Sequence, residues 1–384
     1  MELPNYSGGG IVNLMSSIAQ ARGGKTPYKT LKTLPPGKIK DSKNIVLMVI
    51  DGLGFEYLKE KGQKTILGEN LVGPITSVFL PTTACAIPTF LTGVAPQQHA
   101  FTAWHMNLKE IGVVSKILRF SPRMGGKIFS EFGFTVDEVF DEKPFFSKIK
   151  TKSFSVNPKL ITNSDFMGLI STKAKKGSYG TLDSFFSQTK KAINSVGKKY
   201  VYTYWQNFDD LSHKYGVGSK KIEKHLKEFD KKLRGFVNGL RGTNTTLIIT
   251  ADHGFIDTPL NRIIKIEDHP QLKECLTLPL CGEGRTAYCY VRPSKVKQFE
   301  GYVKTKLKKY CDLYKGQDLI NRNFFGLGKP NKKLFDRVGD YVLVCKENYI
   351  IKDSIKRTDI EKNIGHHGGV SKQEMIVPLV VIKC

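Results

Sequence analysis

The stretch NIVLMVI at residues 44–50, followed at once by Asp51, decides the fold. A continuous apolar run of this kind is typical of a strand buried on both faces, as in the middle of a parallel sheet. Three comparable runs lie further along the chain, at 200–205, 246–250 and 375–382. Helical patterns such as 220–240 lie between the runs. This alternation predicts an α/β fold with a largely parallel central sheet flanked by helices.

Acidic residues follow three of these runs: Asp51, Asp209 and Asp252. Because ligands bind at the carboxyl ends of the strands in open α/β sheets, we expect these carboxylates to converge. Converging carboxylates repel one another unless cations neutralise them. His213 and His253 accompany two of the acids, and mixed Asp/His ligation without thiolates suits zinc or manganese. Taken singly, each Asp is more often only the N-cap of the next helix, but their joint occurrence after several buried strands favours a site.

The net charge of the chain limits the class of partner. Lys and Arg number 60 against 35 Asp and Glu, which gives +25 at pH 7. Such a surface attracts anions at long range, whether nucleotides, nucleic acid or anionic lipid. We expect an anionic small-molecule substrate, either a nucleotide or a phosphodiester, although the charge alone does not identify a reaction. Nucleic acid is a possible further partner, and plain solubility explains the charge equally well.

The cysteine pattern and the lack of long apolar segments predict a cytoplasmic location. The seven cysteines form no CxxC pair, which is typical of reduced thiols rather than of a disulfide framework or a cysteine zinc site. No stretch approaches the roughly 20 apolar residues of a membrane span. The first ten residues lack the basic and then apolar pattern of a secretory signal.

The segment VFLPTTACAIPTFLTG at 78–93 reads as an extended stretch that leads into a helix, with hydroxyls at the helix start. A hydroxyl in this position faces free backbone N–H groups and the positive end of the helix dipole, which favours a phosphoryl oxygen nearby. A coordinated metal lowers the pKa of a hydroxyl and makes it nucleophilic. Capping alone would explain either Thr82 or Thr83.

Five motifs in order make the chain resemble the alkaline phosphatase superfamily, and within it the type I phosphodiesterase/nucleotide pyrophosphatase family. They are the strand that ends in Asp51-Gly52, PTTACAIPTFLTGVAPQQH at 81–99, DDLSHKYG at 209–216, TADHG at 250–254 and GHHG at 365–368. Each motif is weak alone, but their common order is specific. The resemblance implies a metal-dependent hydrolase of phosphoric ester or anhydride bonds with an alkaline-phosphatase-like fold.

The resemblance also implies the site residues. One metal would be held by Asp209, His213 and His367, and the other by Asp51, Asp252 and His253, with Thr83 bridging both as the catalytic nucleophile. Family spacing selects Thr83 over Thr82, Asp209 over Asp210, and His367 over His366. We expect two zinc ions, with manganese as the alternative. Attack by Thr83 would form a covalent phospho-threonine-type intermediate, which water then cleaves.

One departure from the family pattern concerns the substrate. Trp104 stands where the family has an Asn that binds a phosphate oxygen, and Asn107 follows three residues later. Trp104 and Asn107 are therefore the candidate substrate-binding residues. The alternatives are a phosphomonoesterase or a phosphonoacetate-type C–P hydrolase on the same metal site. A non-catalytic nucleic-acid-associated protein is a third reading, supported only by the charge.

The order of the motifs predicts three parts of the chain. They are an N-terminal extension packed on the core (1–43), a catalytic α/β metal-binding domain (44–257 plus 361–384) and an inserted α+β cap (258–360). The cap contains strand-like pieces at 286–291 and 341–345 and a basic helix near 296–310. Its lysines either guide a polyanionic substrate or form a solvated surface.

Overall fold

The computed structural model describes residues 1–355 and 362–384. Its central sheet has seven strands in the order β2-β18-β9-β1-β8-β6-β7. Their bounds are β1 (Asn44–Ile50), β2 (Leu71–Thr76), β6 (Lys152–Pro158), β7 (Lys175–Tyr179), β8 (Lys199–Trp205), β9 (Thr245–Thr250) and β18 (Ile376–Lys383). Strand β1 is parallel to β8 and β9, whereas β18 is antiparallel to β9 and β2. The predicted, largely parallel sheet is confirmed.

Strands β1, β8 and β9 end at the same edge of the sheet. All their residues are buried, as the apolar runs predict. Asn44 pairs with both Lys199 and Thr245, so the three strands start in register. Strand β18 runs the other way, and its first residue therefore lies at the edge where the other three end.

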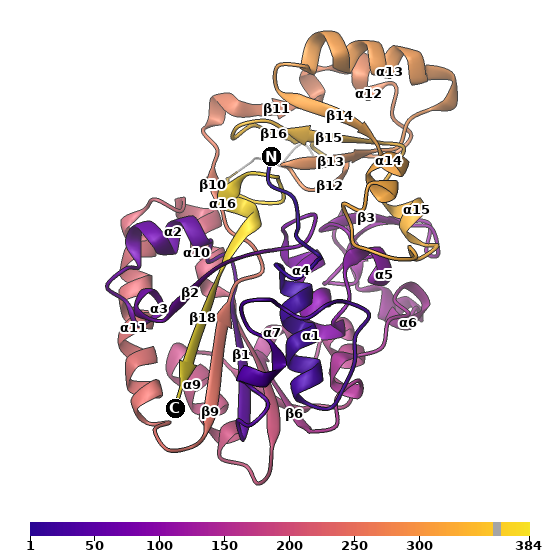
Figure 1. Ribbon diagram of the computed structural model, residues 1–384. Helices are drawn as coiled ribbons and strands as arrows, with labels where there is room; N and C mark the ends of the chain where they lie inside the picture. Colours follow the sequence, from indigo (N-terminus) through magenta and orange to yellow (C-terminus); the bar gives the residue numbers. More distant parts are fainter. Residues whose placement is uncertain (356–361) are drawn as a thin grey trace.

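Helices flank the central sheet, whereas α12 to α15 lie with the second sheet (Figure 1). The α-helices of the described residues are α1 (Ile11–Ala21), α2 (Phe55–Lys61), α3 (Ile66–Glu69), α4 (Thr83–Thr92), α5 (Pro96–His99), α6 (Val136–Val139), α7 (Lys159–Thr162), α8 (Asp165–Ile170), α9 (Leu182–Ile193), α10 (Asn207–Tyr215), α11 (Lys220–Asn238), α12 (Pro270–Lys273), α13 (Val296–Tyr302), α14 (Gly316–Asn321), α15 (Leu334–Arg337) and α16 (Lys372–Met375). Helix α11 buries a stripe at helical spacing: Ile222, Leu226, Phe229, Leu233 and Phe236. None of the helices in the described residues combines the length and apolar character that a bilayer crossing requires.

A second, antiparallel sheet lies beside the end of the first one where the acids were predicted (Figure 1). Its seven strands, in spatial order, are β14 (Cys311–Lys315), β15 (Tyr341–Cys345), β13 (Thr286–Cys289), β12 (Cys281–Gly282), β3 (His105–Leu108), β4 (Val113–Lys116) and β5 (Ser121–Pro122). Two short pairs complete the strands: β10 (Ile256–Asp257) with β17 (Gly365–His366), and β11 (Ile263–Lys265) with β16 (Ile350–Lys352).

The second sheet draws its strands from two stretches of the chain, because β3, β4 and β5 precede the segment 258–360 that was predicted to form the cap. The division of the chain into three parts stays a prediction, and its boundary at 360/361 lies outside the described residues. The predicted basic helix near 296–310 is α13, which continues as a wider helical turn over 303–307. The N-terminal helix α1 is almost wholly buried and packs on α4.

Candidate active site

The three acids that follow the central strands meet at one edge of the sheet. Asp51 and Asp252 directly follow β1 and β9, and both are buried. Asp209 lies in the first turn of α10, which follows β8. The common register of these strands brings the acids together, as the sequence predicts.

Asp51, Asp252 and His253 form the first candidate metal site. His253 Nε2 lies 3.3 Å from Asp51 Oδ1 and 3.5 Å from Asp252 Oδ2. The ligand atoms of these three buried residues all lie within 4.8 Å of one another. This spacing is that of a ligand set that one cation could hold together.

Asp209, His213 and His367 form the second set. His213 Nε2 lies 3.6 Å from Asp209 Oδ1 and 3.2 Å from His367 Nε2. His253 Nε2 is also within 3.9 Å of Asp209 Oδ1, so His253 could be grouped with Asp209 and His367 instead. We assign His253 to the first set because its distances to Asp51 and Asp252 are shorter, and because His213 is nearer to Asp209.

Backbone and tyrosine groups orient these side chains. The Nδ1 atoms of His213 and His253 lie 2.9 and 3.1 Å from the carbonyl oxygens of Gly365 and Gly254, which leaves each Nε2 directed at the acids. The hydroxyl of Tyr204 donates to Asp51 Oδ2. Such outer partners hold the ligands in place before a metal arrives.

The chemistry of the donor set fits divalent cations. Within residues 1–355 and 362–384, Asp51 Oδ1, Asp209 Oδ1 and Asp252 Oδ2 are buried and accept no hydrogen bond. Burial raises the pKa of Asp51 to about 7 and that of Asp252 to about 8, and it raises the pKa of Asp209 well above its usual range. Positive charge at this place would offset the cost of burying three carboxylates.

The histidines are held in the form that binds metals. Burial lowers the pKa of His213 to about 4 and lowers the pKa of His367 well below its usual range. Both imidazoles are therefore neutral near pH 7 and have a lone pair for a cation. The candidate site joins neutral imidazoles to carboxylates that need a counter-charge.

Thr83 is the hydroxyl that faces this site. It is the first residue of α4, and its Oγ1 lies 3.5 Å from Asp51 Oδ2 and 3.2 Å from His253 Nε2. Thr82 turns away, because its Oγ1 donates to Glu283 Oε1 at 2.7 Å. The two hydroxyls that the local sequence left as alternatives thus have different surroundings.

The two other pairs of neighbouring candidates, Asp209 with Asp210 and His366 with His367, also differ in position. Asp210 also lines the cavity, but it is exposed and accepts a hydrogen bond from Gln206 Nε2 at 3.3 Å. His366 lies in β17, which pairs with β10. The next residue, His367, faces the acids, because its Nε2 lies 3.9 Å from Asp209 Oδ1. The roles of all these residues stay predictions, but the geometry is that expected from the family spacing.

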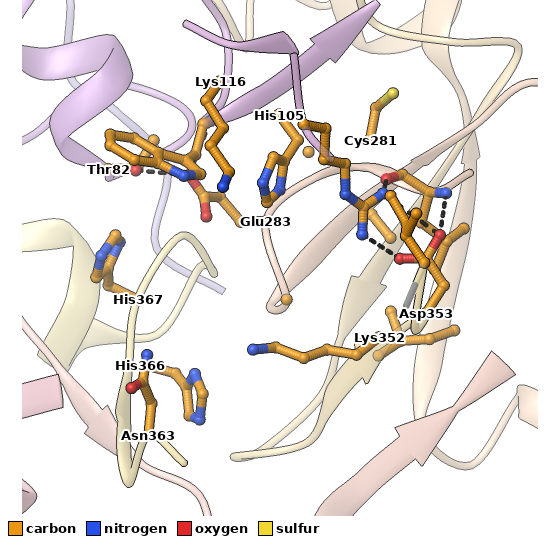
Figure 2. Close-up of a pocket in the computed structure, with 18 of the residues that line it drawn as sticks. Thr82, His105, Lys116, Cys281, Glu283, Lys352, Asp353, Asn363, His366 and His367 are labelled. Atoms are coloured by element: carbon orange, nitrogen blue, oxygen red, sulfur yellow. Dashed lines mark hydrogen bonds and ion pairs between the residues drawn. The ribbon is translucent and has the colours of Figure 1, made fainter. Parts of the chain in front are cut away.

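A cavity of about 760 Å³ opens beside Thr83, Asp209 and His367 and extends to the second sheet (Figure 2). Trp104 lines this cavity. Asn107 is not among the described residues that line the cavity. His105 lines the cavity, and Asn107 lies two residues further along β3. Of the two candidate substrate-binding residues, the structure places only Trp104 at the cavity.

Glu283 and Lys352 also line the cavity, although the sequence did not indicate either of them. Glu283 directly follows β12 of the second sheet, and Lys352 is the last residue of β16. Glu283 Oε1 accepts hydrogen bonds from the Thr82 hydroxyl and, at 3.0 Å, from the Trp104 backbone N–H. Burial raises the pKa of Glu283 to about 7 and lowers that of Lys352 to about 8. Neither residue follows a buried apolar run or belongs to a motif, so the sequence contains no local signal for them.

The fold and the two ligand sets define a metallohydrolase with an alkaline-phosphatase-like architecture. A family model described as type I phosphodiesterase/nucleotide pyrophosphatase matches residues 45–370, and the chain belongs to this family. The family consists of metal-dependent phosphohydrolases, and the chain has its two candidate metal sites. A search of curated proteins found no match.

Solved structures with the same fold include a murine nucleotide pyrophosphatase/phosphodiesterase, in unmodified and inactive forms, and a bacterial phosphonoacetate hydrolase. Murine ectonucleotide pyrophosphatase/phosphodiesterase 5 is 18% identical, with a TM-score of 0.66 over 87% of each chain. An inactive threonine-to-alanine variant of it, solved in complex with AMP, matches equally well. Phosphonoacetate hydrolase from Sinorhizobium meliloti is 17% identical, with a TM-score of 0.64 over 88% of this chain and 89% of that one. At these identities the likeness shows the fold alone.

Proposed function

We propose that the protein hydrolyses phosphodiester or pyrophosphate bonds through a covalent intermediate on Thr83, with two divalent cations held by the six Asp and His side chains. The position of Thr83 carries this proposal. Its hydroxyl oxygen lies within 3.5 Å of one carboxylate and one imidazole of the first ligand set. It also begins a ten-residue helix, whose N-terminal dipole favours the phosphoryl oxygens of a bound substrate.

Two divalent cations held by the Asp and His side chains would lower the pKa of the Thr83 hydroxyl and neutralise phosphoryl charge. Thr83 Oγ1 loses its proton to solvent through the cavity and attacks phosphorus. The bond to the leaving oxygen breaks, and the phosphoryl group remains esterified to Thr83. Water then attacks the same phosphorus atom, the bond to Thr83 Oγ1 breaks, and the hydroxyl is regenerated.

A nucleotide is the substrate class that we favour. The family contains nucleotide pyrophosphatases, and the inactive murine relative was solved with AMP. The net charge of +25 draws such anions toward the protein at low ionic strength. We propose zinc for both sites, with manganese as the alternative, because half of the ligands are carboxylates.

A substrate panel tests the proposal. Protein reconstituted with zinc or manganese is assayed with the 4-nitrophenyl ester of thymidine 5′-monophosphate, with bis(4-nitrophenyl) phosphate, with 4-nitrophenyl phosphate and with phosphonoacetate. We expect kcat/KM for the nucleotide diester to exceed that for the monoester by at least about 10-fold. Preference for the monoester would favour a phosphomonoesterase, and preference for phosphonoacetate would favour C–P bond hydrolysis. No turnover of any substrate would overturn the proposal.

A further inference from the structure

Two cysteines face each other across neighbouring strands of the second sheet. Cys311 is the first residue of β14 and Cys345 is the last residue of β15, and the register of the two strands pairs them directly. Both thiols are buried, and their Sγ atoms lie 3.5 Å apart. The reaction scheme uses neither of them.

The backbone hydrogen bonds show what kind of strand pair the two cysteines form. The Lys346 N–H donates to the Tyr310 carbonyl at 2.8 Å, so this neighbouring pair is hydrogen-bonded. Such pairs alternate along an antiparallel ladder, and the Cys345 N–H donates at 2.9 Å to Arg285 on the other side instead. Cys311 and Cys345 are therefore a non-hydrogen-bonded pair. The Cα atoms of such pairs lie about 4.5 Å apart, within the roughly 4.4–6.8 Å that a disulfide spans.

The surroundings of the two thiols favour a disulfide over a metal site. Among the described residues, the groups of three or more close metal-ligating side chains are the Asp and His sets of the active site. Two thiols alone do not complete the four-ligand shell of a structural zinc. Phe299, Leu307 and Leu343 belong to the same apolar cluster as the pair. A disulfide has no strong polar group to satisfy in such surroundings.

Strand β14 lies at one edge of the second sheet, where it pairs with β15 (Figure 1). Edge elements open locally more easily than central ones. The ion pair between Lys346 and Asp312 crosses the two strands at 3.0 Å, but both side chains are partly exposed, so it adds little stability. A covalent link between residues 34 positions apart would restrain the unfolded chain and fasten this edge.

We propose that Cys311 and Cys345 form a reversible disulfide that fastens β14 to β15 when a hydroperoxide oxidises them. One sulfur attacks hydrogen peroxide, the O–O bond breaks, and a sulfenic acid and one water form. The second thiol then attacks the sulfenic sulfur, the S–O bond breaks, and a second water leaves. Two thiols and one peroxide thus give one disulfide and two waters. Without an oxidant the two cysteines stay thiols, as the cysteine pattern predicts.

The environment of Cys311 makes this oxidation slow. The hydrogen bond with Cys345 and burial both raise the pKa of the Cys311 thiol, so little thiolate is present in the closed state. Reaction therefore takes place while the edge strand is open, and the disulfide forms when it closes. The inference does not depend on the proposed function.

Peptide mapping of the full-length, metal-loaded protein tests the disulfide directly. Reduced protein is incubated with hydrogen peroxide, its remaining thiols are alkylated under denaturing conditions, and it is digested with trypsin without reductant. The cysteines then lie in separate peptides, 310–315 and 338–346. We expect these two peptides to be the main disulfide-linked product and to separate on reduction. Cys384, which is less buried, reports that the oxidant has reacted with the protein.

Oxidation of Cys384 while Cys311 and Cys345 remain alkylated as free thiols would overturn the inference. A main product that links either of them to another cysteine would also overturn it.

Thermal unfolding tests whether the link fastens the strands. Oxidation should raise the Tm of the unmodified protein by about 3 °C or more, and reduction should reverse the rise. Cys311→Ala should lose both the linked peptides and the rise in Tm. Cys289→Ala is the matched control and should keep both, because it removes another buried thiol from the same sheet. An unchanged or lowered Tm in the linked protein, or a rise that survives in Cys311→Ala, would overturn the inference.

Discussion

The two sheets contribute to the cavity in different ways. The central sheet delivers its reactive side chains at strand ends: Asp51 and Asp252 directly follow parallel strands whose register brings them together. The second sheet contributes Glu283 from a turn and Trp104 from the residue before β3. Groups with metal and phosphoryl chemistry thus lie on one side, and groups that position neighbours or contact the rest of a substrate lie on the other. Changes on the first side should abolish turnover, and changes on the second should alter selectivity or stability.

The largest effect is expected at the nucleophile of the first side. Thr83→Ala should remain folded and bind metal, but its turnover should fall by about 10³-fold or more, since no other hydroxyl replaces it. Thr83→Ser should keep part of the activity, because it retains the hydroxyl but loses the methyl that restricts its rotamer. Steady-state kinetics with a diester substrate, together with metal analysis, measures both variants.

Thr82→Ala is the control for this prediction. Its hydroxyl donates to Glu283 and does not face the ligand sets. Near-normal turnover in Thr83→Ala, or a larger loss in Thr82→Ala, would show that the wrong hydroxyl has been assigned and would break the comparison between the two sides.

A smaller loss is expected when one metal ligand is neutralised. Asp209→Asn should lower the bound metal from two ions toward one and reduce turnover at least about 100-fold, since even outer partners of metal ligands cost about 10–100-fold. Elemental analysis and kinetics are measured together. Asp210→Asn is the neighbouring control for metal binding. Asp210 lines the cavity, so its neutralisation can change kcat/KM, but the variant should still bind two ions. An equal loss of metal in the two variants would remove Asp209 from the ligand set.

On the second side, the expected effect is on stability. Glu283→Ala leaves the Thr82 hydroxyl and the Trp104 N–H without their acceptor, which should lower the free energy of unfolding by roughly 1–3 kcal/mol. Glu283→Gln keeps an acceptor oxygen and should cost less. Urea unfolding of the metal-loaded protein measures both variants, with Glu228→Ala, exposed on α11, as the control. An unchanged free energy in Glu283→Ala would show that these hydrogen bonds do not link the two sides.

The smallest effect is a pH dependence of the metal-free protein. The pKa values of Asp51 and Asp252 are about 7 and 8 in the folded state, against about 4 for an unfolded Asp. The folded state therefore binds more protons at these two carboxyls, so their contribution to stability is fully present below about pH 4 and is lost as pH rises through 7 and 8. The buried histidines act in the opposite direction, because their lowered pKa values favour the folded state as pH rises to about 6.5. Above that pH the histidines no longer titrate, so we expect the Tm of metal-free protein to fall between pH 7 and pH 8.5.

Two comparisons check the cause of this pH dependence. Zinc at saturation should remove the fall in Tm, because the cations replace the protons between the carboxylates. Metal-free Asp252→Asn should show a smaller fall than the unmodified protein, since one of the raised carboxyls is gone. A Tm that rises from pH 7 to pH 8.5 in the metal-free protein would contradict the account of the buried acids.

The central strands and the convergence of the three acids could be predicted from the sequence, and the structure shows both. The six ligands and the role of Thr83 come from the family resemblance and stay predictions. A buried strand shows itself as a local apolar run, and residues that directly follow such strands are brought together whatever else the chain does. Asp51 and Asp252 could therefore be located from their immediate neighbours in the chain. The local sequence left Thr82 and Thr83 open, because both offer the same hydroxyl at the start of one helix.

Only the tertiary structure shows how the other residues of the site are brought to the edge of the central sheet where β1, β8 and β9 end. His367 reaches the acids because β18 runs antiparallel, so the segment before it lies where β1, β8 and β9 end. Glu283 reaches the cavity because a second sheet, built from two distant stretches, lies over that edge, and Lys352 reaches it from β16, which pairs with β11. Asn107 is excluded from the cavity by its place two residues along β3. Such placements depend on pairings between segments far apart in the chain, and no local pattern encodes them.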